Sequence, residues 1–196
     1  PPMFIPGDIL GGDFDGDGDQ DVIFVADVSE RTFKSIGSDE DQSYWSTIHL
    51  LFNDGTGRLI EDFSRYNKGE PPRLPAPYRI EVADFNSDGV DEAFIGSFGV
   101  PVLREDNTNS WIEYPHLALI SDEETHREVY ISQSAPEAED NPSLKNTFAH
   151  DASSGDVDGD GDIDVFMNGV MYFNDGKGNF DLVDLNQKQV VESWGI

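Results

Sequence analysis

The sequence contains no cysteine, few basic residues and no long uninterrupted apolar stretch. Without cysteine, neither disulfide bonds nor thiolate metal sites can form. Only 12 lysines and arginines stand against 40 aspartates and glutamates, which gives a formal net charge of −28. A chain this negative repels nucleic acids and anionic membrane surfaces, and it attracts cations. No apolar run reaches the roughly 20 residues of a membrane-spanning helix, so we expect no membrane insertion.

Apolar stripes with the period of a helix are also scarce, whereas turn-forming residues are common. Hydrophobic residues make up 37% of the chain and include 13 phenylalanines, which indicates a folded protein. The 19 glycines and 11 prolines separate short apolar runs, a pattern that predicts strands and turns. No signal-peptide pattern opens the chain, and Pro1-Pro2-Met3 is interpreted as the start of a mature or truncated protein.

One segment of the sequence occurs three times at nearly equal spacing. Each copy is an aspartate-rich stretch followed at once by an apolar run, and the copies begin at Asp13, Asp84 and Asp156. A near-constant period is the sign of repeated structural units. We call the three stretches loop one (residues 13–21), loop two (84–92) and loop three (156–164).

A second repeated element predicts a hairpin in two of the three units. Asn-Asp-Gly-x-Gly follows an apolar run at Asn53 and again at Asn174, and Asn and Gly tolerate the positive φ of a tight hairpin turn. In the middle unit, a longer polar turn over residues 121–126 is expected instead. Each unit therefore predicts a sheet of four strands. In the third unit, these strands are predicted at residues 148–154, 164–168, 170–173 and 179–183.

The three loops carry oxygen ligands in the pattern of a metal site. Alternate side chains of a tightly wound loop point inward, so the first, third, fifth and ninth residues can share one ion, with a backbone carbonyl from the seventh. This donor set suits Ca²⁺, which takes about six to eight oxygens, whereas zinc prefers His or Cys. The twelfth residue is apolar in each case, which excludes an EF-hand. The predicted ligands are Asp13, Asp15, Asp17, Asp19 and Asp21; Asp84, Asn86, Asp88, Val90 and Glu92; and Asp156, Asp158, Asp160, Asp162 and Asp164.

These motifs resemble the FG-GAP/VCBS repeat family. The resemblance rests on the Asp-x-Asp-x-Asp-Gly-x-x-Asp loop with its following apolar strand, on the Asn-Asp-Gly-x-Gly hairpin and on the lead-in at residues 148–150. It covers most of the chain, about residues 9–184, and implies about three calcium ions in blades like those of the integrin α-subunit propeller. Loop two departs from the pattern, with Ser87 in place of glycine and Glu92 in place of aspartate.

The expected fold is all-β, with three four-stranded antiparallel blades of β-propeller type. Propellers commonly have four to eight blades, so we expect these three to be part of a larger propeller or assembly. The chain is expected to form one repeat domain with linkers at about residues 64–77 and 132–146. Its predicted parts are blade one (1–63), blade two (64–132), blade three (133–184) and the start of a further blade or a tail (185–196).

No catalytic residues are predicted. His150 precedes Asp151 and Ser153 in the sequence, but adjacency along a chain is not the geometry of a catalytic triad. Polar insertions separate the second and third predicted strands at residues 27–46 in the first unit and 98–115 in the second. Aromatic residues in these two insertions are the candidate ligand-binding side chains, because Trp and Tyr on loops suit sugar stacking or protein contact. These residues are Tyr44, Trp45, Trp111 and Tyr114.

The resemblance implies a secreted, extracellular or cell-surface module for adhesion or for binding a glycan or protein, with calcium in a mainly structural role. Two alternatives remain open. The chain could be an accessory region of a carbohydrate-active enzyme such as a polysaccharide lyase, which predicts a convergent pocket of basic and aromatic residues. It could instead be a structural subunit of a cell-surface assembly in which neighbouring chains cover its open sheet edges.

Overall fold

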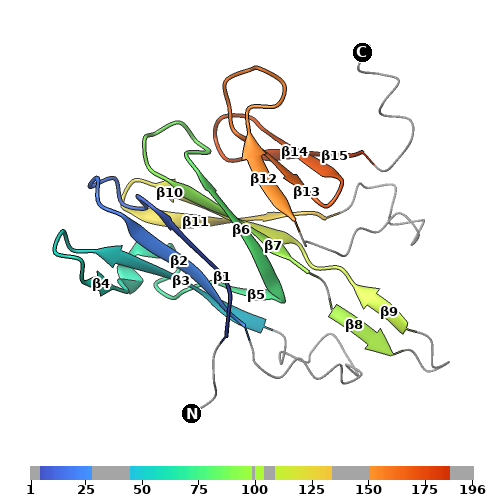
Figure 1. Ribbon diagram of the computed structural model, residues 1–196, viewed down its shortest axis with the longest axis horizontal. Helices are drawn as coiled ribbons and strands as arrows, with labels where there is room; N and C mark the ends of the chain where they lie inside the picture. The colour runs from blue at the N-terminus through green and yellow to red at the C-terminus, as the bar shows by residue number, and fades with distance from the viewer. Residues whose placement is uncertain (1–4, 28–44, 99, 104–108, 134–150, 186–196) are drawn as a thin grey trace.

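A computed structural model of the protein describes residues 5–27, 45–98, 100–103, 109–133 and 151–185. Apart from one short 3-10 turn, every regular element in these ranges is a β-strand, and three antiparallel sheets follow one another along the chain (Figure 1). The all-β prediction with propeller-type blades is confirmed, although the described sheets do not close into a ring. No helix in these ranges is long and apolar enough to cross a membrane.

Blade one has the strand order β1-β2-β3-β4, and a fifth strand, β5, pairs with the opposite end of β3 from β4. This added strand comes from residues 64–77, which were expected to form only a linker. The Asn-Asp-Gly turn joins β3 to β4 as predicted. The elements are β1 (Ile5–Gly12), β2 (Asp21–Asp27), β3 (Trp45–Asn53), β4 (Leu59–Ile60), the 3-10 turn η2 (Phe63–Arg65) and β5 (Arg73–Pro75).

Blade two has the strand order β11-β10-β7-β6, blade three has the order β12-β13-β14-β15, and β8 pairs with β9 within the second insertion. In blade three, the last three predicted strands match the observed ones to within one residue at either end. The strands are β6 (Pro77–Ala83), β7 (Glu92–Ser97), β8 (Val100–Leu103), β9 (Asn109–Ile112), β10 (His116–Asp122), β11 (Thr125–Ile131), β12 (Ala152–Gly155), β13 (Asp164–Met167), β14 (Val170–Asn174) and β15 (Phe180–Asp184).

The turn of blade two is shorter than the sequence predicted. Only Glu123 and Glu124 lie between the paired ends of β10 and β11, and Glu123 has a positive φ of 57°. Ser121 and His126 pair with each other inside the ladder and are buried. The expectation of a long polar turn over residues 121–126 is therefore wrong. Neighbouring elements supply hydrogen-bond partners for these two polar residues, and the sequence does not reveal those elements.

Two buried apolar clusters hold the blades together. Successive side chains of a strand point to opposite faces, so β7 directs Ile95 towards blade one and Phe94 towards blade three. The first cluster joins Ile95 to Ile23 of blade one, and the second joins Phe94 to Tyr172 of blade three. Blade two is thus buried on both faces, and dispersion and hydrophobic burial at these faces hold the stack together.

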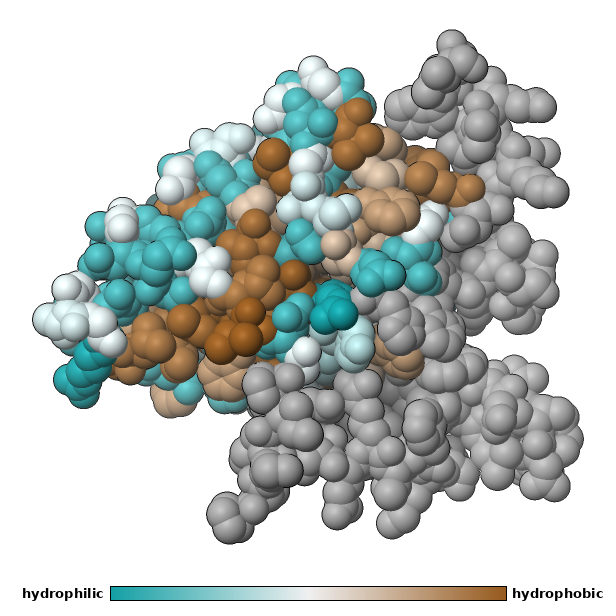
Figure 2. Space-filling view, viewed as in Figure 1, coloured by the Kyte–Doolittle hydropathy of each residue, from teal (hydrophilic) through white to brown (hydrophobic). Residues whose placement is uncertain are grey.

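All three acidic loops lie at the same end of the blades, where each joins the first and second strand of its sheet. Strands β8 and β9 lie at the opposite end (Figure 1). Figure 2 shows hydrophilic residues gathered over the loop end, next to a hydrophobic band on the same face.

The exposed fraction of the second residue of each loop depends on whether a neighbouring blade covers it. Phe14 and Phe85 are 1% and 0% exposed, because each packs in a cluster between two blades. The equivalent Val157 of loop three is 61% exposed. In the described part of the chain, the outer face of blade three therefore lacks the neighbouring blade that covers the equivalent residue in the other two blades.

His116 begins β10 and is buried between blades two and three. Its Nδ1 accepts a hydrogen bond from the backbone N–H of Ser97 at 3.0 Å, and its ring packs against Phe94 and Tyr172. Burial lowers the pKa of His116 to about 3 from an ordinary value of 6.5. The imidazole is therefore neutral in the folded protein at neutral pH.

The low pKa of His116 predicts a loss of stability in mild acid. The unfolded chain binds a proton at this histidine once the pH falls below 6.5, whereas the folded chain does not until about 3. The free energy of unfolding that depends on neutral His116 is therefore fully present above pH 6.5. It is lost as the pH falls, at a limiting slope of about 1.4 kcal/mol per pH unit. Urea denaturation between pH 6.5 and 4.5 should show a shallower loss for His116→Asn than for the wild type. Parallel curves would contradict this assignment.

Candidate metal centres

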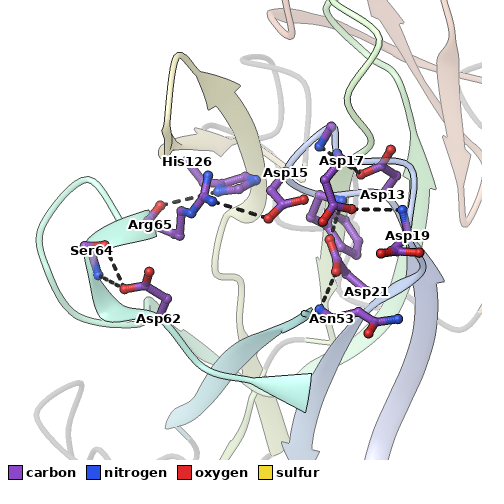
Figure 3. Close-up of polar contacts among 12 residues, drawn as sticks. Asp13, Asp15, Asp17, Asp19, Asp21, Asn53, Asp62, Ser64, Arg65 and His126 are labelled. Carbon is purple, nitrogen blue, oxygen red and sulfur yellow. Dashed lines mark hydrogen bonds and ion pairs between the residues drawn. The ribbon is translucent and has the colours of Figure 1, made fainter. Parts of the chain in front are cut away.

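Loop one is a wound turn between β1 and β2, held by its own backbone. Asp13 Oδ1 accepts the N–H of Gly16 at 2.8 Å, and Asp13 Oδ2 accepts the N–H of Gly18 at 2.9 Å. Both glycines have positive φ, which they adopt without a Cβ clash. The winding brings one carboxylate oxygen each of Asp13, Asp15 and Asp21 within 4.8 Å of one another (Figure 3). This group could hold a metal ion.

Asp15 carries the clearest free ligand atom of loop one. Its Oδ2 lies 3.3 Å from Arg65 Nη2, while its Oδ1 is buried without a hydrogen-bond partner. Burial, followed by the charge of Asp17, raises the pKa of this carboxyl, and Arg65 opposes the shift. A buried carboxylate oxygen without a partner is costly. A cation within the loop would satisfy it, so the residues present fit such an ion.

The ninth residue, Asp21, also has a structural role. Its Oδ2 accepts the backbone N–H of Phe14 at 2.8 Å, and its Oδ1 accepts the backbone N–H of Asn53 at 2.7 Å. Burial raises the pKa of Asp21, and these two hydrogen bonds act in the opposite direction. The sequence predicted this residue only as a ligand. The structure adds that Asp21 fastens the loop to the end of β3.

Loop three repeats the arrangement with more exposure to solvent. Asp156 Oδ1 and Oδ2 accept the N–H groups of Gly159 and Gly161 at 2.7 and 3.2 Å. Asp156, Asp158 and Asp164 form the second group whose oxygens lie within 4.8 Å of one another. Asp164 is buried and makes the same two backbone hydrogen bonds as its counterpart in loop one. This loop could therefore also hold a metal ion.

The fifth and seventh residues lie outside these close groups. In every loop, the carboxylate of the fifth residue accepts the backbone N–H of the seventh at 2.8–3.0 Å. This bond shapes the turn, and the role of both positions as ion ligands stays a prediction. The pairs are Asp17 and Asp19, Asp88 and Val90, and Asp160 and Asp162.

Loop two has the same winding but different chemistry. Asp84 Oδ1 and Oδ2 accept the N–H groups of Asp88 and Gly89 at 3.1 and 3.0 Å. Ser87 adopts a φ of 61°, at a position where the other loops have glycine. Across the described residues, close groups of three metal-ligating side chains occur in loops one and three, and the acids of loop two form no such group. Because Asn86 stands at the position of Asp15 and Asp158, loop two has one carboxylate fewer on its inward face, and its role as an ion site stays a prediction.

The interior of loop two is filled by hydrogen-bond donors. Ser121 Oγ lies 2.5 Å from both Asp88 Oδ2 and Glu92 Oε1. Asn86 Nδ2 donates to Ser121 Oγ at 2.8 Å and to Asp88 Oδ2 at 3.0 Å. Burial raises the pKa of Glu92 to about 7, while hydrogen bonds from Ser121 and from the backbone of Phe85 act to lower it. Ser121 is thus a site residue that the sequence analysis missed.

Arg65 and His126 connect loop one to blade two (Figure 3). Besides its contact with Asp15, Arg65 offers its backbone carbonyl to His126 Nδ1 at 3.3 Å. His126 Nε2 is buried without a hydrogen-bond partner, and burial lowers the pKa of this histidine. Both residues reach the loop from elements distant in the sequence, so no local motif marks them.

Two of the four aromatic candidates meet in the structure. The rings of Trp45 and Tyr114 lie 6.4 Å apart in an edge-to-face arrangement. Trp45 is the first residue of β3, at the opposite end from Asn53 and loop one. Tyr44 lies outside the described residues, and Trp111 belongs to β9 with no side-chain description. The pair therefore joins the last residues of the two insertions, at the end of the blades away from the acidic loops.

Successive antiparallel sheets with wound acidic loops define a repeat protein of β-propeller type. Residues 13–95 match the family model described as an FG-GAP-like repeat. The chain thus carries an FG-GAP-like repeat, and the resemblance inferred from the loop motifs is confirmed for this segment, which includes loops one and two. Loop three lies outside it. A search of curated proteins found no match.

The double hydrogen bond of Asp21 predicts a stability cost that does not depend on a metal. In EDTA, Asp21→Asn should lower the free energy of unfolding by about 1–3 kcal/mol. One backbone N–H then faces the NH2 group of the amide, which cannot accept its hydrogen bond as the carboxylate oxygen does. Urea denaturation measures the change. Asp19→Asn removes the same charge from the same loop without touching these two bonds and serves as the control. Equal losses in both variants would contradict the fastening role.

Proposed function

We propose that the protein is a calcium-binding repeat module of the cell exterior or cell surface that binds a glycan or protein ligand, with calcium in a structural role. The observation that carries the calcium proposal is the buried Asp15 Oδ1, which has no hydrogen-bond partner and lies in a group of three carboxylates. Loop three supports it, because its group has the same composition and the same backbone winding.

The chemistry of the donors favours calcium over other metals. All side chains in the two groups offer carboxylate oxygens, which suit hard cations, whereas zinc sites usually include His or Cys. Magnesium demands a near-ideal octahedral site at short distances, whereas calcium accepts the irregular set of ligands that a wound loop supplies. Calcium sites of extracellular modules often have dissociation constants of roughly 10⁻⁴–10⁻³ M, within reach of the calcium concentration outside cells.

A structural role follows from where the ligands lie. Asp21 belongs to the acidic group and also fastens loop one to the end of β3 through Asn53. An ion held by this carboxylate would neutralise the clustered charge and strengthen a contact that the fold already uses. Since the unfolded chain does not assemble the group, binding energy becomes folding energy.

The proposed ligand surface lies at the other end of the blades, around Trp45 and Tyr114. Aromatic side chains bring a large apolar face with a polar handle, the combination that suits stacking on a sugar ring or contact with a protein. These two lie at the ends of the insertions, and functional residues often lie on loops carried by a rigid scaffold. The aromatic pair favours a ligand-binding module over a purely structural subunit.

Completion of the stack by further blades or by another chain is part of the proposal. Val157 is 61% exposed at the position where Phe14 and Phe85 pack in clusters between blades. Three blades are also fewer than propellers commonly contain. Covering Val157 with a further sheet would give loop three the environment that loops one and two already have.

The calcium proposal predicts a large thermal response. For a site saturated at about 100 times its dissociation constant, calcium should raise the melting temperature by roughly 5–10 °C, and EDTA should reverse the rise. Asp15→Asn together with Asp158→Asn should abolish most of this response in differential scanning calorimetry. Glu70→Gln with Glu123→Gln, which removes two exposed acids outside the loops, should keep it. A wild-type melting temperature unaffected by calcium would sink the structural role.

The ligand proposal predicts a specific loss on removing Trp45. A glycan array and a pull-down from extracellular material would identify a binder. Trp45→Ala should then weaken its affinity by roughly tenfold or more, as expected for an aromatic anchor. Phe63→Ala removes an aromatic that is 52% exposed in η2, away from the pair, and should leave the affinity unchanged. Equal affinity of the Trp45 variant would place the ligand elsewhere.

A further inference from the structure

We infer that loop two keeps its shape through a hydrogen-bond network centred on Ser121 and takes up no cation, so that the protein binds two calcium ions instead of three. The count of two rests on the proposed function of loops one and three. The statement about loop two rests on its own contacts, which differ from those of loops one and three at the third and ninth positions and in the hydroxyl group of Ser121.

A residue at the end of the third strand of each blade decides what enters the loop. In blades one and three this residue is Asn53 or Asn174, whose backbone N–H bonds the carboxylate of the ninth loop residue at 2.7 or 2.9 Å. Its side chain turns away into the hairpin, where its Oδ1 accepts a glycine N–H at 2.9 or 3.1 Å. The interior of the acidic loop is left to the carboxylates.

In blade two the equivalent residue is Ser121. Its backbone N–H makes the corresponding bond to Glu92 Oε1 at 3.2 Å, which establishes the equivalence. This blade has no Asn-Asp-Gly turn to cap, and the Ser121 hydroxyl points into loop two. There it lies 2.5 Å from oxygens of both Asp88 and Glu92. Serine in place of asparagine at this position therefore accounts both for the missing hairpin motif and for the hydroxyl group inside loop two.

Asn86 completes the network from the third position of the loop. Its Oδ1 accepts the backbone N–H of Asp88 at 3.0 Å, so the amide nitrogen faces inward. That nitrogen donates to the hydroxyl of Ser121 at 2.8 Å and to its carbonyl at 3.3 Å. In loop one the same position is Asp15, whose inward oxygen has no partner. A donor therefore stands in loop two where a metal would need an acceptor.

The extra methylene of Glu92 lets its carboxylate satisfy more backbone groups than aspartate does. Its Oε2 accepts the N–H groups of Phe85 and Asn86 at 2.7 and 3.2 Å, and its Oε1 faces Ser121. Glu92 is fully buried, so replacing these bonds with a hydrated ion would remove partners from buried polar groups. Asn86 and Glu92, which stand where loop one has Asp15 and Asp21, both serve the network.

This arrangement makes the central blade independent of calcium. Chelation is expected to loosen the two loops that hold ions and to leave loop two wound, because its inward carboxylates already accept hydrogen bonds from Asn86 and Ser121 of the same blade. The stack would then respond to calcium mainly in its outer blades, around a central blade that does not.

Native mass spectrometry and calorimetric titration can count the bound ions and measure their affinities. The test compares three variants that carry the same substitution at the fifth position of each loop. The wild type should bind two calcium ions. Asp17→Asn and Asp160→Asn should each weaken one of them by roughly tenfold or more, whereas Asp88→Asn should leave the count and both affinities unchanged. Three ions in the wild type, or an ion weakened by Asp88→Asn, would overturn the inference. A wild type without any bound ion would remove the calcium proposal and leave the statement on loop two intact.

Ser121→Ala provides a second readout that does not depend on the ion count. Loss of the hydroxyl should lower the melting temperature by several degrees (roughly 2–8 °C) and by the same amount in calcium and in EDTA. Ser154→Ala removes a hydroxyl bonded to Glu81 on the exposed surface and should shift it by about 1 °C at most. An unchanged melting temperature for Ser121→Ala, or a loss confined to calcium-containing buffer, would refute the network. A loss confined to EDTA, with one additional ion bound in calcium, would support it, because an ion would then replace the hydroxyl.

Discussion

One buried carboxylate in each blade holds the architecture of the loop end together. Asp21, Glu92 and Asp164 each accept the backbone N–H of the second loop residue with one oxygen and the N–H that ends the third strand with the other. A buried acceptor of this kind leaves few alternatives to the backbone, because releasing it would strand two donors and a charge. The shape of the loop is therefore set before any ion is considered.

The same constraint explains why loops with one winding can have different interiors. Once the ninth carboxylate has fixed the loop, the remaining carboxylates face inward and repel one another unless something positive or hydrogen-bonding comes between them. Loops one and three each bring three carboxylates together in this space, in a group that could hold a cation. Loop two fills it with the hydroxyl of Ser121 and the amide of Asn86. In the proposed function, a chain with a net charge of −28 therefore relieves the repulsion in its acidic turns in two ways, by cations in loops one and three and by hydrogen bonds in loop two.

The two ends of the blades have separate tasks in the proposed function. The loop end supplies stability, through the carboxylate fastening and the ions. The opposite end supplies the aromatic pair of Trp45 and Tyr114 at the ends of the insertions. Between the two ends, the apolar clusters on both faces of blade two hold the sheets against one another. A surface carried on such a stack is held by elements whose own geometry does not depend on the ligand.

The features that the sequence predicted well are those encoded within a few neighbouring residues. The acidic groups of loops one and three that could hold a metal ion lie within nine residues each, and the strands of blade three are short apolar runs between glycine and asparagine turns. Both were therefore predictable from spacing alone.

Contacts between distant parts of the chain decided the rest. The pairing of β5 with β3, the burial of His126 and the contact of Arg65 with Asp15 involve residues far apart in sequence, and no local pattern announces them. Ser121 reads as part of a polar turn until the pairing of β10 with β11 and of β10 with β7 places it beside Glu92. The sequence by itself determined which loops are acidic and how they wind. Only the tertiary structure decided which of them has an unsatisfied oxygen for a cation, because that depends on the donors that other strands bring into the loop.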